Sequence, residues 1–186
     1  MKKHTLLVGI VGHKQAGKDT LCNFLHSELV TTTIRMGFAD VLKKEFCNLV
    51  CGKVETIEEH KNHPVLRRAL QDYGSWRRGQ NSDYFIRALE TSLLYLSDHI
   101  EFVIIPDVRF PNEASWIKDN CGILVRIKNK AADAVEDYHE SECYVAKIGT
   151  DFEIDNSGTT KELLEKARKL AVTLKQLQQA LVTAIK

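Results

Sequence analysis

The chain has 186 residues, with 26 Lys and Arg against 25 Asp and Glu, and a formal net charge of +1. This length predicts one domain with a substantial core, and the charge balance gives no electrostatic reason to expect a nucleic-acid or membrane partner. The five cysteines form an odd, scattered set without a Cys-x-x-Cys pair. They favour reduced thiols in a cytoplasmic setting over a disulfide framework or a zinc site.

Apolar runs alternate with helical stretches from end to end. The sequence predicts strands at 6–11, 31–38, 101–105, 123–127 and 152–154, and helices at 18–30, 39–50, 64–73, 83–97, 112–120 and from 160 onward. A basic connector at 74–82 separates two of these helices, and the segments 51–63 and 128–150 are polar. Apolar strands joined by helices are typical of a parallel sheet covered on both faces. We therefore expect a three-layer α/β fold with a five-stranded parallel sheet.

A phosphate-binding loop is predicted directly after the first strand, where GHKQAGK has the spacing G-x-x-x-x-G-K. A buried strand leads in and an amphipathic helix leads out, so loop amides and the helix N-terminus would bind phosphate oxygens. The alternative is a strand–turn–helix junction that uses glycine only for geometry. The predicted nucleotide-binding residues are Gly12, His13, Lys14, Gln15, Ala16, Gly17, Lys18, Asp19 and Thr20.

The two residues that follow the loop lysine are candidate ligands for a metal ion. Asp19 stands where the motif ordinarily has serine or threonine, and Thr20 comes one place late. A carboxylate is a hard oxygen ligand for Mg²⁺, and it is favourable beside a triphosphate only with a metal between the two. We therefore expect Asp19 and Thr20 to hold Mg²⁺, Asp19 either directly or through a water.

A second acidic residue follows an apolar run in FVIIPDVRF. Asp107 falls at the carboxyl end of its strand, where open α/β sheets bind ligands, and is predicted as a further metal ligand; the alternative is a cap on the next helix. Arg109 offers a planar fork for a phosphate, or else forms a surface ion pair with Glu113. Lys18, Asp107 and Arg109 are the predicted catalytic residues.

Four stretches in this order resemble the deoxynucleoside monophosphate kinases of bacteriophages: GHKQAGKDT at 12–20, FADVLK at 38–43, IPDVRFPNEA at 105–114 and HESE at 139–142. The resemblance runs along nearly the whole chain, and an aspartate after the loop lysine is a feature of that group. Animal phosphomevalonate kinases share the fold family and the Gly-Lys-Asp loop, and they have an element similar to Ser141–Cys143. The PDVRFPNEA stretch favours the phage kinases.

The resemblance implies a nucleoside-monophosphate-kinase-like fold in one domain, residues 1–186, with a substrate-binding helical part at 39–98 and a lid at 128–147. An acceptor phosphate beside a triphosphate concentrates negative charge, so several cations are needed. The predicted substrate-binding residues are Asp40, Lys43, Arg68, Arg78 and Arg109; the alternative for the paired arginines is solvated surface charge. The lid segment contains no arginine, so either a lysine or Arg126 at its base would serve the phosphates. The predicted lid elements are Arg126, His139, Ser141 and Glu142.

Together these features predict an enzyme that uses ATP and Mg²⁺ to phosphorylate a deoxynucleoside monophosphate. The alternatives are a phosphomevalonate kinase and, from another class, a non-catalytic nucleotide-binding module. The expected partners are ATP and the small acceptor, with no nucleic acid and no membrane, for a monomer or homodimer. The expected location is cytoplasmic, in the host cytoplasm if the protein is phage-encoded.

Overall fold

A computed structural model describes residues 5–50, 53, 57, 59–60, 63–134 and 140–185, with the backbone alone at 31, 140, 141 and 185. Five strands form one sheet in the order β2-β3-β1-β4-β5, and every neighbouring pair is parallel. The predicted five-stranded parallel sheet is therefore confirmed. The strands are β1 (Leu6–Val11), β2 (Thr33–Arg35), β3 (Phe102–Val108), β4 (Ile123–Lys128) and β5 (Phe152–Asp155).

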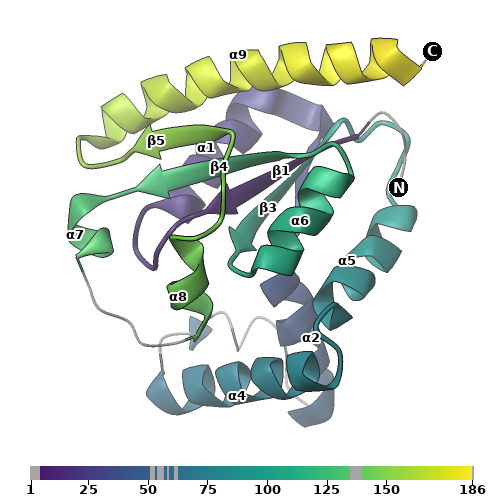
Figure 1. Ribbon diagram of the computed structural model, residues 1–186, viewed down its shortest axis with the longest axis vertical. Coiled ribbons are helices and arrows are strands. Elements are labelled where there is room, and N and C mark those ends of the chain that lie inside the picture. The colour runs from purple at the N-terminus through teal and green to yellow at the C-terminus, as the bar shows by residue number, and fades with distance from the viewer. Residues whose placement is uncertain are drawn as a thin grey trace.

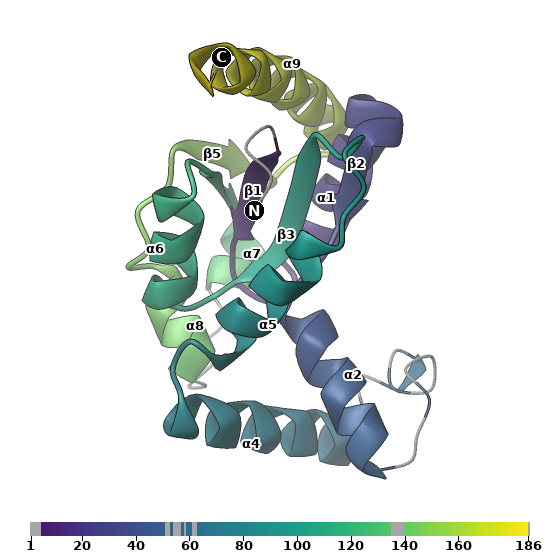
Figure 2. The same cartoon turned by 90° about the vertical axis from the view of Figure 1, so that its right-hand side faces the viewer.

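Helices cover both faces of this sheet and extend beyond one end of it (Figure 1). In chain order they are α1 (Lys18–Leu29), the 3₁₀ turn η1 (Val30–Thr32), α2 (Phe38–Val50), α4 (Pro64–Gln80), α5 (Tyr84–Leu94), α6 (Pro111–Asp119), α7 (Lys130–Asp133), α8 (Glu140–Val145) and α9 (Thr160–Ile185). Figures 1 and 2 both place α4 at the end of the molecule opposite α9. Helices α2, α4 and α5 fall within the predicted substrate-binding part.

The alternation of side chains along β1 divides the core into two layers. Leu6, Val8 and Ile10 pack with residues of α1 and α9, whereas Leu7 and Val11 pack with residues of α2, α5 and α6. Because successive strand residues point to opposite faces, an uninterrupted apolar run such as β1 requires cover on both sides. The central strand is thus fixed in the middle of three layers, and its carboxyl end carries the loop that follows.

Several predicted boundaries are wrong. Strand β3 runs to Val108 and not to 105, and α5 ends at Leu94 and not at 97. Most of the predicted connector at 74–82 is helical, because α4 continues through Gly74 to Gln80. Gly74 is buried, and a Cβ there would lie 2.7 Å from Leu42 of α2, so glycine allows the two helices to pack closely. Strand β2 is shorter than the predicted 31–38, since η1 occupies 30–32 and α2 begins at Phe38.

The described cysteines are all free thiols: Cys22 and Cys47 are buried, and Cys121 and Cys143 are exposed. Among the described residues, no helix has an apolar stretch long enough to cross a bilayer. The polar segment 51–63 lies largely outside the described residues.

Candidate active site

The loop between β1 and α1 is shaped by one glycine and by a side chain from the far end of the chain. Gly17 has φ 99°, a left-handed conformation that strains other residues, and a Cβ there would collide with the Asn156 amide. Asn156, which follows β5, donates its side-chain N–H to the Ala16 carbonyl over 2.9 Å. The loop therefore depends both on its own sequence and on a contact that spans 140 positions.

The Lys18 ammonium lies across this loop. Its Nζ donates to the carbonyl oxygens of Gly12 and His13, over 2.7 and 2.6 Å. Burial, with a smaller contribution from Arg109, lowers the pKa of Lys18 to about 8. Since α1 begins at Lys18, the positive end of its helix dipole adds to the same place. The loop is thus built to attract an anion.

A cleft of about 640 Å³ lies beside the loop, between α2 and the ends of β2 and β3. It brings together side chains that are far apart in the sequence. Six of the predicted site residues line it: Lys18, Asp19, Asp40, Lys43, Asp107 and Arg109. Arg35, at the end of β2, also lines the cleft and was not predicted.

Asp19 is paired within this cleft. Its carboxylate accepts a short hydrogen bond from the Arg35 guanidinium, and the Asp19 side chain is 73% exposed. Burial of Arg35 acts to lower its pKa, but the hydrogen bond to Asp19 and the negative charges of Asp19, Asp40 and Cys22 together outweigh burial, so the pKa of Arg35 is raised. The pair places a cation and a carboxylate side by side at the entrance, next to Lys18.

Asp107 holds the beginning of α2. Its two carboxylate oxygens accept the backbone N–H groups of Phe38 and Ala39, over 3.1 and 2.5 Å. Gly37 makes this approach possible, because a Cβ there would lie only 2.7 Å from Asp107 Oδ1. Burial raises the pKa of Asp107, and the Ala39 N–H partly offsets the rise. Asp107 therefore caps a helix, as the alternative reading had it, but the helix is α2 and not the one that follows β3.

Arg109 is directed by two glutamates. Glu113 Oε2 accepts the backbone N–H of Arg109 over 2.9 Å, and also that of Phe110 over 3.1 Å. The Arg109 guanidinium donates a short hydrogen bond to Glu142 of α8. Glu113 thus fixes the backbone while Glu142 holds the side chain.

Arg78 supports the turn between β3 and α6, which carries Arg109. Its guanidinium lies over the rings of Phe85 and Phe110, 4.7 and 4.3 Å from their centres, and 3.5 Å from Glu113 Oε1. Glu113 is buried, and burial raises its pKa to about 7 even though Arg78 acts to lower it. Arg78 therefore contacts the residue that positions Arg109, and it does not line the cleft itself.

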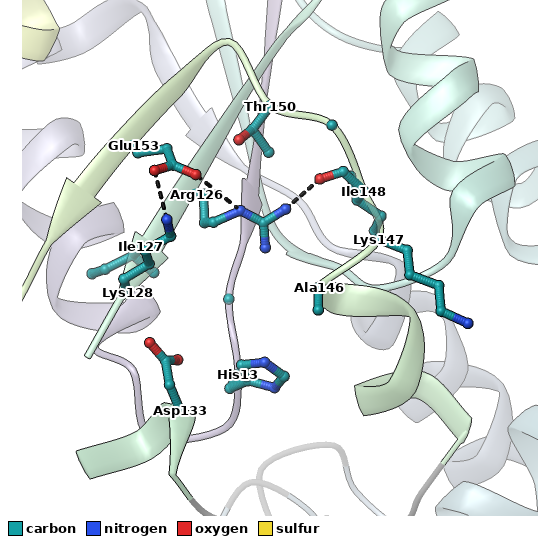
Figure 3. A pocket seen from close by; sticks show the side chains of 12 residues that line it. His13, Arg126, Ile127, Lys128, Asp133, Ala146, Lys147, Ile148, Thr150 and Glu153 are labelled. Carbon is teal, nitrogen blue, oxygen red and sulfur yellow. Dashed lines mark hydrogen bonds and ion pairs between the residues drawn. The ribbon is translucent and has the colours of Figure 1, made fainter. Parts of the chain in front are cut away.

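A second cavity of about 470 Å³ lies between the loop, the end of β4 and the segment that leads into β5 (Figure 3). Arg126, the residue predicted for the lid base, lines it. The buried Arg126 guanidinium donates to the carbonyls of Val145, over 2.8 Å, and Ile148, and lies 3.6 Å from Glu153. Figure 3 shows it directed toward Ile148 and Glu153. Arg126 thus anchors the end of α8 to the sheet.

Arg68 and Thr20 lie outside the cleft lining. Arg68 is 76% exposed on α4 and forms a helical ion pair with Asp72 over 2.9 Å, which is the surface alternative for that arginine. Thr20 is exposed on α1. His139 lies outside the described residues, and so does the side chain of Ser141.

The cleft carboxylates fit a magnesium ion that arrives with a nucleotide. Mg²⁺ in such sites uses one or two carboxylates, with phosphate oxygens and waters as its other ligands. Asp19 and Asp107 both line the cleft beside Lys18 and could supply these ligands. Within the described part of the chain, no group of three or more His, Cys, Asp or Glu forms a ready-made metal site.

The topology, the loop and the cleft together define a P-loop kinase-like α/β protein. In overall shape the chain is similar to shikimate kinase from Aquifex aeolicus vf5, with a TM-score of 0.48 and 13% identity over 92% of this chain and 97% of that one. No family model matches the chain. In sequence it is 30% identical over 179 residues, 84% of this chain and 91% of the relative, to a protein of Acanthamoeba polyphaga mimivirus named "Putative deoxynucleotide monophosphate kinase". The chain belongs to the same nucleoside-monophosphate-kinase-like family.

Proposed function

We propose that the protein transfers the γ-phosphoryl group of ATP to a deoxynucleoside monophosphate, with Mg²⁺, giving the diphosphate and ADP. The observation that carries this proposal is the cleft, where the loop lysine Lys18 and the β3-end arginine Arg109 line one space. A site for phosphoryl transfer between two phosphates needs this juxtaposition of cations. The name of the mimivirus relative, which specifies a deoxynucleotide monophosphate, supports the choice of acceptor.

The charges of the cleft support a role for magnesium. Four cations, Lys18, Arg35, Lys43 and Arg109, share the lining with three carboxylates, Asp19, Asp40 and Asp107. The lining therefore carries a net charge of about +1 when all seven groups are ionised, far less than a triphosphate and a monophosphate together require. A divalent cation held by Asp19 and Asp107 would supply the missing charge and would bridge phosphate oxygens.

We assign the roles accordingly. The loop amides and Lys18 bind the phosphates of ATP, and Arg109 binds the transferring or accepting phosphate, assisted by Lys43 and Arg35. Direct in-line transfer needs positioning and charge stabilisation only, so no covalent intermediate is invoked. Closure of the predicted lid over ATP would limit hydrolysis by water.

An ADP-release assay with ATP and Mg²⁺ tests this proposal against its alternatives. We expect release that depends on at least one of the four deoxynucleoside monophosphates and exceeds the acceptor-free rate by at least about 100-fold. ADP release that depends on phosphomevalonate, and on none of the deoxynucleoside monophosphates, would favour phosphomevalonate as the acceptor. If folded protein binds ATP but releases no ADP with any acceptor, the protein is a nucleotide-binding module and the kinase proposal is wrong.

A further inference from the structure

Glu142 places a negative charge inside the anion-binding end of the loop. It lies on α8, and its side chain is only 4% exposed. Glu142 Oε2 accepts the backbone N–H of Lys14 over 3.2 Å and lies 3.2 Å from His13 Nδ1, while Oε1 accepts from the Arg109 guanidinium. A carboxylate 128 positions away from Lys14 in sequence thus bonds to the loop and to the arginine across the cleft.

The groups around Glu142 are those that a phosphate would use. A loop amide and a guanidinium are standard phosphate donors, and the carboxylate accepts from both. Burial acts to raise the pKa of Glu142, but Arg109, His13 and the Lys14 N–H outweigh it and leave the pKa below its usual value. The carboxylate is therefore ionised at neutral pH. Its negative charge occupies the positively charged surroundings that would otherwise hold a phosphate group.

We propose that Glu142 is an internal competitor of the terminal phosphate of ATP: it occupies the Lys14 amide and Arg109 until that phosphate displaces it. The inference rests on the proposed function, because it takes ATP as the ligand of this loop. Two anions cannot share the same donors at contact distance without a large repulsion. Binding of the terminal phosphate and docking of Glu142 therefore exclude each other, and the Glu142 carboxylate leaves the loop when ATP binds.

This arrangement makes Glu142 a positioning residue that determines when Arg109 becomes available. While Glu142 holds the guanidinium, Arg109 is not aligned on a phosphate, so at low ATP concentrations the competition lowers the rate of ATP hydrolysis. The competition also raises the apparent dissociation constant of ATP by a factor close to the ratio of docked to undocked Glu142. ADP lacks the terminal phosphate, so its affinity should depend much less on Glu142.

Calorimetric binding of AMP-PNP and ADP to wild-type, Glu142→Gln and Glu142→Ala protein tests the proposal. We expect both variants to bind AMP-PNP about tenfold more tightly, for a ratio of docked to undocked Glu142 near ten, and to bind ADP less than about threefold more tightly. At ATP concentrations well below saturation, hydrolysis of ATP without an acceptor should rise several-fold in both, and the difference should vanish at saturating ATP. The matched control is Glu165→Gln, which removes one negative charge from an exposed position on α9 and should behave as wild type.

The outcomes separate this inference from the proposed function. If folded variants, checked by thermal unfolding, bind AMP-PNP no more tightly than wild type, or more weakly, Glu142 is a structural ion pair and the inference is wrong. An equal gain for ADP and AMP-PNP also overturns it, because the effect is then not specific to the terminal phosphate. If neither wild type nor variants bind either nucleotide, the proposed function fails and the inference with it.

Discussion

The two sides of the cleft are constructed in different ways. On the loop side, the groups that we propose bind phosphate come from consecutive residues, and Lys18 bonds to carbonyls only five and six positions away. On the other side, Asp107 contacts Phe38 across 69 positions, and Glu142 contacts Arg109 across 33. Local sequence therefore positions Lys18, and the loop needs only the support of Asn156 and Glu142 from far along the chain, whereas the other side exists only once the chain has folded. Substitutions should distinguish the two sides. On the loop side they should lower the reaction rate without changing stability, and on the other side they should weaken both the fold and acceptor binding.

The largest effect is expected at Lys18. Lys18→Ala removes the ammonium at the loop and should lower kcat at least about 100-fold, the usual loss for one charge-stabilising donor. The melting temperature should change little, because the residue mainly bonds to its own loop. The ADP-release assay and thermal unfolding measure both, with exposed Lys161→Ala on α9 as control. Retention of wild-type kcat would remove Lys18 from the mechanism.

Asp107→Asn should affect fold and function together. The amide has one acceptor oxygen in place of two, so one of the first N–H groups of α2 loses its partner and the free energy of unfolding should fall by about 1–3 kcal/mol. Because α2 also carries Asp40 and Lys43 of the cleft, KM for the acceptor should rise about tenfold. Urea unfolding and steady-state kinetics test this, with exposed Asp119→Asn as control. A kinetic loss at unchanged stability would mean that the residue acts on the metal alone.

Asp19→Ser should alter magnesium dependence more than the fold. The substitution removes a mostly exposed carboxylate, so the Mg²⁺ concentration for half-maximal activity should rise several-fold as one ligand is weakened. Stability should change by less than about 0.5 kcal/mol, as is usual for exposed sites. Magnesium titrations of activity measure the first quantity and denaturant unfolding the second. An unchanged magnesium requirement would place the metal on other ligands.

The smallest effect concerns pH and Glu113. Its folded-state pKa of about 7 lies above the ordinary 4.5, so the folded protein binds more protons than the unfolded chain between these values. Stability from this residue is therefore present below about pH 4.5 and decreases as pH rises toward 7. Glu113→Gln cannot titrate, so its melting temperature should decline less between pH 5 and pH 7.5, by a few degrees. Parallel declines in wild type and variant would show that Glu113 ionises normally.

The same contrast between local and distant contacts explains what the sequence could predict. Strands β1, β3 and β4 were readable because each is a mainly apolar run next to a stretch with helical periodicity, and the loop was readable because its spacing is contiguous. The full extent of α4 was not readable, since Gly74 and the basic residues after it resemble a connector until the contact with Leu42 is known.

The site was predictable where one residue carries its own signal. Lys18, Asp19, Asp107 and Arg109 follow motif spacing or strand ends, and the fold brings them to one cleft. Arg35 and Asn156 were missed because a single basic residue after a short strand, or an asparagine in a turn, has no local pattern. Arg68 and Arg78 were equivalent in sequence; only the packing shows that Arg78 contacts Glu113 while Arg68 is on the surface.

The central claim is that phosphoryl transfer between two nucleotides takes place in this cleft. The most direct measurement incubates protein with γ-³²P-labelled ATP, Mg²⁺ and each deoxynucleoside monophosphate, and follows the label by chromatography. We expect label to appear in a deoxynucleoside diphosphate with wild type and to be nearly absent with Lys18→Ala. Label found only in inorganic phosphate, or in the diphosphate at equal rates for both proteins, would contradict the claim.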